Sequence, residues 1–216
     1  MEQPLFRRRV ELAVKLVLLA VFLAAAVAFA VLAGVGNSYD AKGEPMAQPI
    51  PFSHKHHVGD VGLDCRFCHS TVEKTAFAGM PSTQVCLGCH SQLFAQAGIL
   101  AALKNSAASG QPIAWQRVHF LPGFVYFDHS IHVSKGVACM ECHGRIDQMP
   151  LTWQVHKLEM GWCIDCHRDP APHLHPHDQV FAMPAEPLGD ADTQLLARTL
   201  KLQGTQRLTD CSTCHR

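Results

Sequence analysis

All ten cysteines of this 216-residue chain occur in one repeated pattern, in which two residues separate a pair of cysteines and a histidine follows immediately. The five copies are Cys65, Cys68 and His69; Cys86, Cys89 and His90; Cys139, Cys142 and His143; Cys163, Cys166 and His167; and Cys211, Cys214 and His215. Two thiols at this spacing can add to the two vinyl groups of a haem, and the adjacent histidine can bind the iron. The pattern therefore predicts five covalently bound c-type haems.

Zinc ribbons and disulfides use similar cysteine spacings and are the alternatives to weigh. Between Cys68 and Cys86 lie 17 residues, and between Cys142 and Cys163 lie 20, and both spacings suit a zinc ribbon. Five cysteine pairs, however, cannot combine into four-cysteine sites without a remainder. Neither zinc nor a disulfide framework requires a histidine after every second cysteine. Covalent haem attachment accounts for every position.

Two further pairs of histidines, each spaced His-x-x-His, lie shortly before the first and the third motif. They are His54 with His57 and His129 with His132, and each pair has a phenylalanine two positions before it and a valine directly after it. A second axial ligand closes a haem iron to substrate and leaves a low-spin centre suited to electron transfer. Histidines one helical turn apart point to the same side. We therefore expect one of each pair to bind its own motif's haem and the other to reach a neighbouring haem.

The N-terminal region contains a run of 20 uncharged residues, 16–35, which is long enough for a helix to cross a bilayer. Arg7, Arg8, Arg9 and Lys15 precede it, so the positive-inside rule places the N-terminus in the cytoplasm and the haem motifs on the exported, periplasmic side. A cleaved signal peptide is the alternative. Because the run exceeds the usual 7 to 15 apolar residues of a signal peptide, a retained anchor in the cytoplasmic membrane is favoured.

The repetition of the histidine pairs predicts the domain organisation. Residues 1–36 form the cytoplasmic tip and anchor helix, 37–51 a linker, 52–114 a first dihaem module, 115–170 a second dihaem module, and 171–216 a connector, short helix and fifth haem-binding tail. The fold class predicted is mainly α with much irregular structure: a transmembrane helix followed by a multihaem cytochrome c domain of duplicated, c7-like dihaem modules. About 36 residues per haem cannot enclose each haem in a side-chain core, so the porphyrins themselves must supply much of it.

Two helices are predicted outside the motifs by apolar spacing and terminal signals. The first covers 91–110 and ends near its C-terminal glycine. The second covers 190–204, with Asp190 or Asp192 as N-cap and Gly204 as its stop. The apolar face of the first helix comprises Leu93, Ala97, Leu100 and Leu103.

Two segments rich in proline, glycine and polar residues, 36–51 and 169–187, are predicted to be extended connectors. His173, His175 and His177 lie in the second connector. Loop histidines beside proline are usually without a dedicated metal, so no further metal site is predicted there. A formal net charge of zero gives no indication of nucleic-acid binding.

Several of these segments together resemble a known family. The anchor, FSHKHHVGDVGLDCRFCHSTVEKTAFAGMPSTQVCLGCH, LPGFVYFDHSIHVSKGVACMECHGRIDQM and MGWCIDCHRDP are similar to the pentahaem cytochrome c subunit of bacterial alternative complex III. The resemblance covers most of residues 52–170 and is weaker in the anchor and tail. It implies an electron-transfer subunit without catalytic residues of its own, within a complex that oxidises quinol and reduces a periplasmic or membrane-bound acceptor. The implied partners are an iron–sulphur subunit, polytopic quinol-binding membrane subunits and a monohaem cytochrome c.

Two other functions remain open from the sequence. A multihaem reductase would need a five-coordinate haem beside a pocket, whereas this chain has ten histidines outside the motifs and seven methionines that could close each iron. A small membrane-anchored quinol dehydrogenase shares the anchor and several haems, but the fifth haem and the duplicated histidine pairs favour the relay.

The fifth distal ligand is chosen among His119, His156, Met149 and Met160. Met149 lies 14 residues before Cys163 and could reach the distal side of the fourth haem, whereas Met160 lies only three residues before it. The family resemblance, in which methionines at these two positions are usual, favours Met149. A thioether ligand would raise the potential of that haem above those with two histidines.

Overall fold

The computed structural model describes residues 8–38 and 43–215. The chain divides into two compact units, Met1–Ala41 and Lys42–Arg216. The predicted division into anchor, linker, two dihaem modules and tail stays a prediction.

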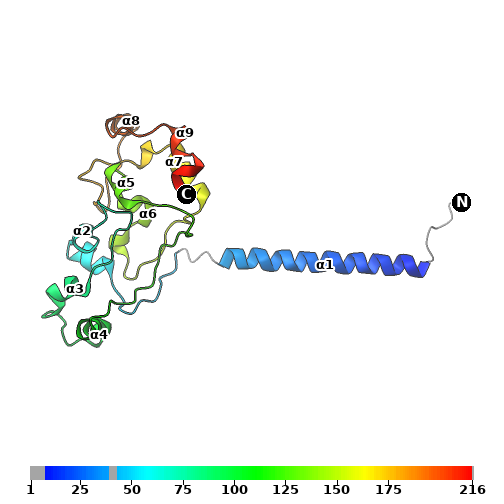
Figure 1. Cartoon of the computed structure of the whole chain (residues 1–216), viewed down its shortest axis with the longest axis horizontal. Helices are drawn as coiled ribbons and strands as arrows, with labels where there is room; N and C mark the ends of the chain where they lie inside the picture. Colours follow the sequence, from blue (N-terminus) through cyan, green and yellow to red (C-terminus); the bar gives the residue numbers. More distant parts are fainter. Residues whose placement is uncertain (1–7, 39–42, 216) are drawn as a thin grey trace. The chain divides into compact units, whose positions relative to one another are not determined.

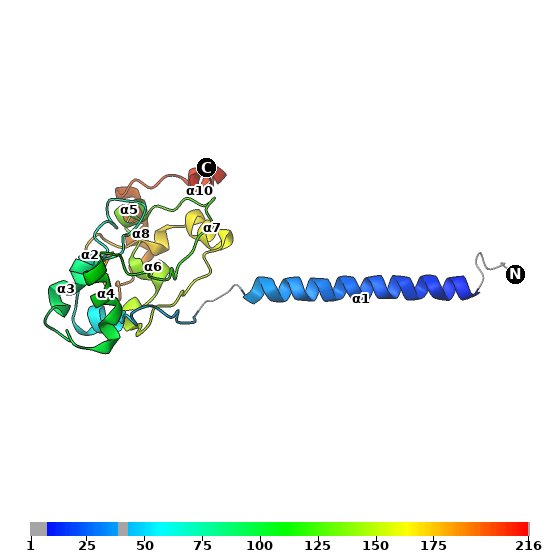
Figure 2. The ribbon, with the colours of Figure 1, turned by 60° about the horizontal axis from the view of Figure 1, so that its bottom comes forward.

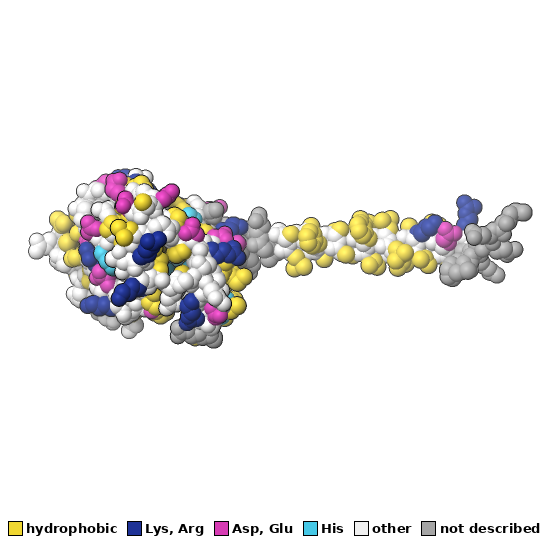
Figure 3. All heavy atoms as spheres, turned by 90° about the horizontal axis from the view of Figure 1, so that it is seen from above, with side chains coloured by type: hydrophobic (Ala, Val, Ile, Leu, Met, Phe, Trp, Pro, Cys, Tyr) yellow, Lys and Arg dark blue, Asp and Glu magenta, His cyan; other side chains and the backbone are white. Residues whose placement is uncertain are grey.

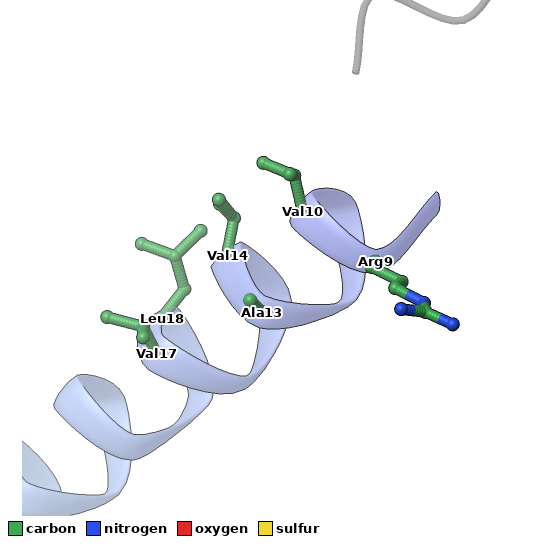
Figure 4. Close-up of a pocket in the computed structure, with 6 residues that line it drawn as sticks. All are labelled: Arg9, Val10, Ala13, Val14, Val17 and Leu18. Carbon is green, nitrogen blue, oxygen red and sulfur yellow. The ribbon is translucent and has the colours of Figure 1, made fainter. Parts of the chain in front are cut away.

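The first unit is one long helix, α1 (Arg8–Ser38) (Figure 1). Its stretch Arg8–Gly34 is long and apolar enough to cross a membrane, and none of that stretch is buried in the protein. Apolar side chains cover the middle of the helix, and the charged ones gather near its N-terminal end (Figure 3). A shallow groove along one side of its first turns is lined by Arg9, Val10, Ala13, Val14, Val17 and Leu18 (Figure 4). A membrane anchor and a signal sequence share these properties, and Arg7 lies outside the described residues.

The second unit consists of short helices joined by long irregular segments (Figure 2). Its helices are η1 (Lys55–Asp60), α2 (Cys65–Cys68), α3 (Thr83–His90), η2 (Gly98–Leu100), α4 (Ala101–Ser109), α5 (His129–Ser134), α6 (Cys139–His143), η3 (Ile146–Gln148), α7 (Met160–Arg168), η4 (Ala171–His173), α8 (Asp190–Thr199), α9 (Thr205–Leu208) and α10 (Cys211–Cys214). Between residues 43 and 215, the β-structure is one isolated bridge that joins Val137 and Leu174. The predicted fold class, mainly helical with much irregular structure, is confirmed.

The side-chain core of this unit is small and divided. One buried cluster joins Ile50, Leu100 and Leu103 beneath α3. A second joins Val72, Val133 and Val180, and thereby connects three segments that are far apart in the sequence. Neither cluster is large enough to support a domain of this length by itself, which agrees with the expectation that porphyrins supply much of the apolar contact.

The helix predicted over 91–110 is correct only in its second half. Leu100 and Leu103 are buried and Gly110, at φ +69°, ends α4 as expected. Leu93, however, is exposed, because α3 ends at His90 and Phe94 has a left-handed backbone with φ of +55° that a helix cannot contain.

The helix predicted over 190–204 is present, but its N-cap and its C-terminal end differ from those predicted. Gly189 is the N-cap of α8, and neither predicted aspartate caps it. The helix ends at Thr199, because Lys201 adopts a left-handed backbone with φ of +51°. Gly204 instead precedes the first residue of α9. Lys135 Nζ donates to the freed carbonyl of Leu200, at 2.7 Å.

Candidate haem-binding site

Each cysteine motif forms or ends a helical turn. A turn places residues i, i+3 and i+4 on one face, so the two thiols and the histidine of a motif point to the same side. The first and fifth motifs are stabilised by matching N-caps: Asp64 accepts from Arg66 N, and Asp210 accepts from Ser212 N. Cys89 and Cys211 are exposed, and the other eight cysteines are partly buried.

The Nδ1 atoms of four motif histidines donate to backbone carbonyls. His69 donates to Gly79 O at 2.7 Å, His90 to Leu93 O at 3.0 Å, His167 to Leu208 O at 2.9 Å and His215 to Phe124 O at 3.1 Å. The remaining motif histidine, His143 of the third motif, has a different partner: its Nδ1 is 3.2 Å from Nε2 of His119. A proton fixed on Nδ1 leaves Nε2 as the lone-pair nitrogen, which is the arrangement that orients a metal-binding imidazole.

The histidines of the two His-x-x-His pairs are also held through Nδ1 by an oxygen atom. Nδ1 of His57 is 2.8 Å from Ser53 O, and Nδ1 of His132 is 2.7 Å from Asp128 O, in both cases the carbonyl four residues before. The first histidine of each pair is held by a residue that is far away in the sequence. Nδ1 of His54 is 2.9 Å from Thr152 Oγ1, and Nδ1 of His129 is 2.8 Å from Ala76 O.

Three of the four distal candidates face a motif histidine at a spacing that suits an iron. Ring centroids are 6.2 Å apart for His57 and His90, 6.1 Å for His132 and His167, and 6.5 Å for His129 and His143. Metal–imidazole bonds are about 2 Å long and each ring centre lies about 1 Å beyond its nitrogen, so two rings on one iron have centres about 6 Å apart. The residues present therefore fit a haem held between two imidazoles.

Burial keeps three imidazoles, those of His54, His132 and His143, in the neutral form that binds metal. Desolvation, and next the nearby His69, lowers the pKa of His54 to about 4. Desolvation also lowers the pKa of His143 to about 3, with His119 and His129 as the next causes. Burial also lowers the pKa of His132. Neutral imidazole is the ligand that iron requires, so these environments favour binding over protonation.

The motif histidines form a row across the two predicted modules. His54 and His57 belong to one short segment, and they neighbour His69 and His90 respectively. The loop 76–79 accepts from both His69 and His129, through the carbonyls of Ala76 and Gly79.

The same row continues towards the C-terminus. α5 carries His129 opposite His143 and His132 opposite His167. His167 in turn donates to Leu208, shortly before the fifth motif. The order along the row is thus second motif, first, third, fourth and fifth.

The four candidates for the remaining distal ligand lie in different places. His119 contacts His143, and His156 stacks on Trp162 with ring centroids 5.2 Å apart. Met149 is buried, and its carbonyl accepts from Lys55 N beside the first histidine pair. Met160 is 71% exposed at the start of α7.

The assignment of Met149 to the fourth haem stays a prediction. The sequence-based prediction placed Met149 at the fourth haem, but the ring facing His167 is that of His132. Among the described residues, the ring contact made by His215 is with Phe124, at 5.9 Å. His54 neighbours His69 of the first motif, so the fifth motif is the one to which none of the four paired histidines is assigned.

One polar cluster was missed by sequence reasoning. Glu141, inside the third motif, is 2.7 Å from Nδ1 of His173 and 3.2 Å from Nε2 of the buried His175. This cluster ties the connector 169–187 to α6. The sequence carries no sign of it, because Glu141 lies more than 30 positions before the two histidines and no motif links them.

Comparison with known proteins adds two findings. Residues 125–216, which contain the last three motifs and the second histidine pair, match the family model described as cytochrome c7 and related cytochrome c. A segment of 125 residues is 37% identical to the menaquinone reductase multiheme cytochrome c subunit of Nitratidesulfovibrio vulgaris. That segment covers 57% of this chain and 53% of the relative, so the chain spans about half the length of that protein.

Proposed function

We propose that this chain, a multihaem cytochrome c whose C-terminal part is c7-like, is a membrane-anchored pentahaem electron relay in a quinone-linked respiratory complex. The observation that supports this most directly is the pairing of imidazoles. Facing rings about 6 Å apart, with Nδ1 fixed on both, would hold iron from both sides and leave no position for a substrate. When bound, such haems exchange single electrons.

The protein's own residues orient and insulate these centres. Backbone carbonyls and Thr152 fix the ring planes, and burial keeps the imidazoles neutral. Because the contacts between neighbouring motifs form one row, the arrangement favours electron transfer along a line. The proposed chain contributes ligands and contains no catalytic residue of its own.

The complex we propose is of the alternative complex III class, in which quinol is oxidised. Its partners would be an iron–sulphur subunit, polytopic quinol-binding subunits and a monohaem cytochrome c, with the acceptor periplasmic or membrane-bound. α1 would be retained as a single-pass anchor in the cytoplasmic membrane, with the haem unit on the exported side.

A second candidate function has its own support. The relative is named as a subunit of a menaquinone reductase, which delivers electrons to quinone and does not withdraw them. The same row of ligand pairs could transfer electrons in that direction. The two candidates share the relay and differ in the sign of the net electron flow.

Purification in mild detergent tests the proposal. We expect iron–sulphur and polytopic subunits to copurify, and the isolated chain to show almost no quinol turnover. Rapid quinol oxidation by the isolated chain would instead establish a quinol dehydrogenase. In the whole complex, reduction of the haems by a quinol analogue, compared with reduction of quinone by the prereduced complex, would separate the two directions.

The topology can be tested independently. All haems should be reduced by a membrane-impermeant donor added to spheroplasts, because the positive residues before the apolar run favour a cytoplasmic N-terminus. Haems that react only after the membrane is opened would contradict the exported location.

A further inference from the structure

The third motif is distinguished by what its histidine contacts. In the other four motifs, Nδ1 of the histidine donates to a backbone carbonyl. His143 instead approaches a side chain, with Nδ1 3.2 Å from Nε2 of His119, ring centroids 4.3 Å apart and planes at 79°. The two rings thus meet edge to face, with these two nitrogens within hydrogen-bond distance.

The ring spacing separates two roles that His119 could have. Two imidazoles on one iron have centres about 6 Å apart, as His129 and His143 do at 6.5 Å. At 4.3 Å His119 is too close to His143 to share an iron with it, and it lies against the Nδ1 side of that ring. Nε2 of His143 therefore stays available to share an iron with His129.

We propose that His119 is a positioning residue for His143: its Nε2 accepts the Nδ1 proton of His143 and so fixes the tautomer and ring plane of the third haem's proximal ligand. The inference rests on the proposal that the third motif binds haem. An imidazole nitrogen is a more basic acceptor than an amide oxygen, so His143 gains more anionic character than the other four motif histidines. A more basic ligand stabilises ferric over ferrous iron, which lowers the reduction potential of this haem relative to one with a carbonyl acceptor.

His119 is also placed to couple two parts of the chain. The irregular segment 117–126 supplies His119 to His143, and further along it supplies the Phe124 carbonyl to His215. Tyr126 N donates to Cys214 O at 2.7 Å. One segment thus supports the proximal ligands of the third and fifth motifs, by a side chain in one case and by the backbone in the other.

The experiment compares three variants of the full-length, haem-loaded chain in detergent. His119→Phe removes the acceptor and keeps an aromatic ring, whereas His119→Gln restores an oxygen acceptor. His177→Phe is the matched control, since His177 is an exposed histidine of the connector 169–187 and is not among the ligand candidates. Spectroelectrochemical titration should show one haem shifted to higher potential in His119→Phe, a smaller shift in His119→Gln, and none in His177→Phe.

The affected haem is identified by resonance Raman spectroscopy. In a His129→Ala background the third haem becomes five-coordinate when ferrous, and its iron–histidine stretching band becomes visible. This band reports the hydrogen bond at Nδ1, so it should move to lower frequency when His119→Phe is added. An unmoved band would overturn the proposal, even if the titration changes. New high-spin haem in His119→Phe alone would also overturn it, because His119 would then be an iron ligand. If neither the unmodified chain nor the His129→Ala variant carried covalent haem, the result would instead contradict the proposed function.

Discussion

The two His-x-x-His segments are alike at one histidine and different at the other. Phe52 stacks on His57 with ring centroids 4.4 Å apart, and Phe127 stacks on His132 at 4.5 Å. Both second histidines also bond to the carbonyl four residues before them. The local sequence contains all of these partners, so a duplicated sequence gives a duplicated structure.

The first histidines of the two segments depend on the opposite module. His54 bonds to Thr152, which follows the third motif, and His129 bonds to Ala76, which follows the first. Each module therefore completes the other. The comparison teaches that the duplication alone makes two local sites, and that the exchange of hydrogen bonds between the copies joins them into one row.

The largest difference we expect concerns the centre and the end of this row. The third motif has His54, His69, His119 and His129 around His143, whereas the second motif lies at the end with Cys89 exposed. Replacing both Cys139 and Cys142 by Ala should remove the third haem. The amount of folded protein should then fall at least roughly tenfold, because the buried histidines around His143 would lose the haem that they contact. Replacing Cys86 and Cys89 by Ala should leave a folded protein with one haem fewer. Yield and intact mass measure both results, and equal yields would show that the third motif is not central.

The next prediction tests the two equivalent histidines. His57→Ala and His132→Ala should each convert one haem towards a high-spin state while all haems stay covalently attached, because thioether bonds do not depend on the distal ligand. Electron paramagnetic resonance and the mass of the intact protein give the two readouts. The exposed His56, which lies beside His57, provides the control variant His56→Ala and should leave the spectrum unchanged. Unchanged low-spin spectra for both variants would mean that the facing rings are not ligands.

A smaller effect is expected at the fifth motif, which has no copy to compare with. If His54, His57, His129 and His132 bind the first four haems at the motif histidines that they neighbour, the fifth haem has none of the paired histidines. Met160 begins α7, which packs against α9 next to that motif, whereas Met149 is buried beside η1. We expect a methionine-to-iron charge-transfer band in the near infrared that disappears in Met160→Ala and persists in Met149→Ala. The reverse pattern would restore Met149 as the ligand, and absence of the band in the parent would indicate another ligand.

The parts of this site that sequence could predict are those written in local spacing. A cysteine pair with a following histidine, or two histidines three apart, need only one helical turn to place their side chains on the same side. The acceptors Gly79, Leu93 and Ala76 could not be predicted, because every residue carries a backbone carbonyl and only the fold selects one. The exposed Leu93 has the same cause, since no local signal marked the left-handed turn at Phe94.

The smallest effect we expect tests how closely the modules match. Phe52→Leu and Phe127→Leu remove an aromatic ring stacked on His57 and His132 respectively, at nearly equal distances and interplanar angles of 22° and 26°. A stacked aromatic pair contributes about 1 kcal/mol beyond its buried area, so both variants should lose about that free energy of unfolding. Phe77→Leu, at a side chain that is 71% exposed, is the control. Denaturation followed by haem absorbance gives the comparison. If the Phe127 variant loses much more than the Phe52 variant, the two modules share a geometry but differ in packing energy, because Val133 of the second segment belongs to a buried cluster whereas the equivalent Val58 is only partly buried.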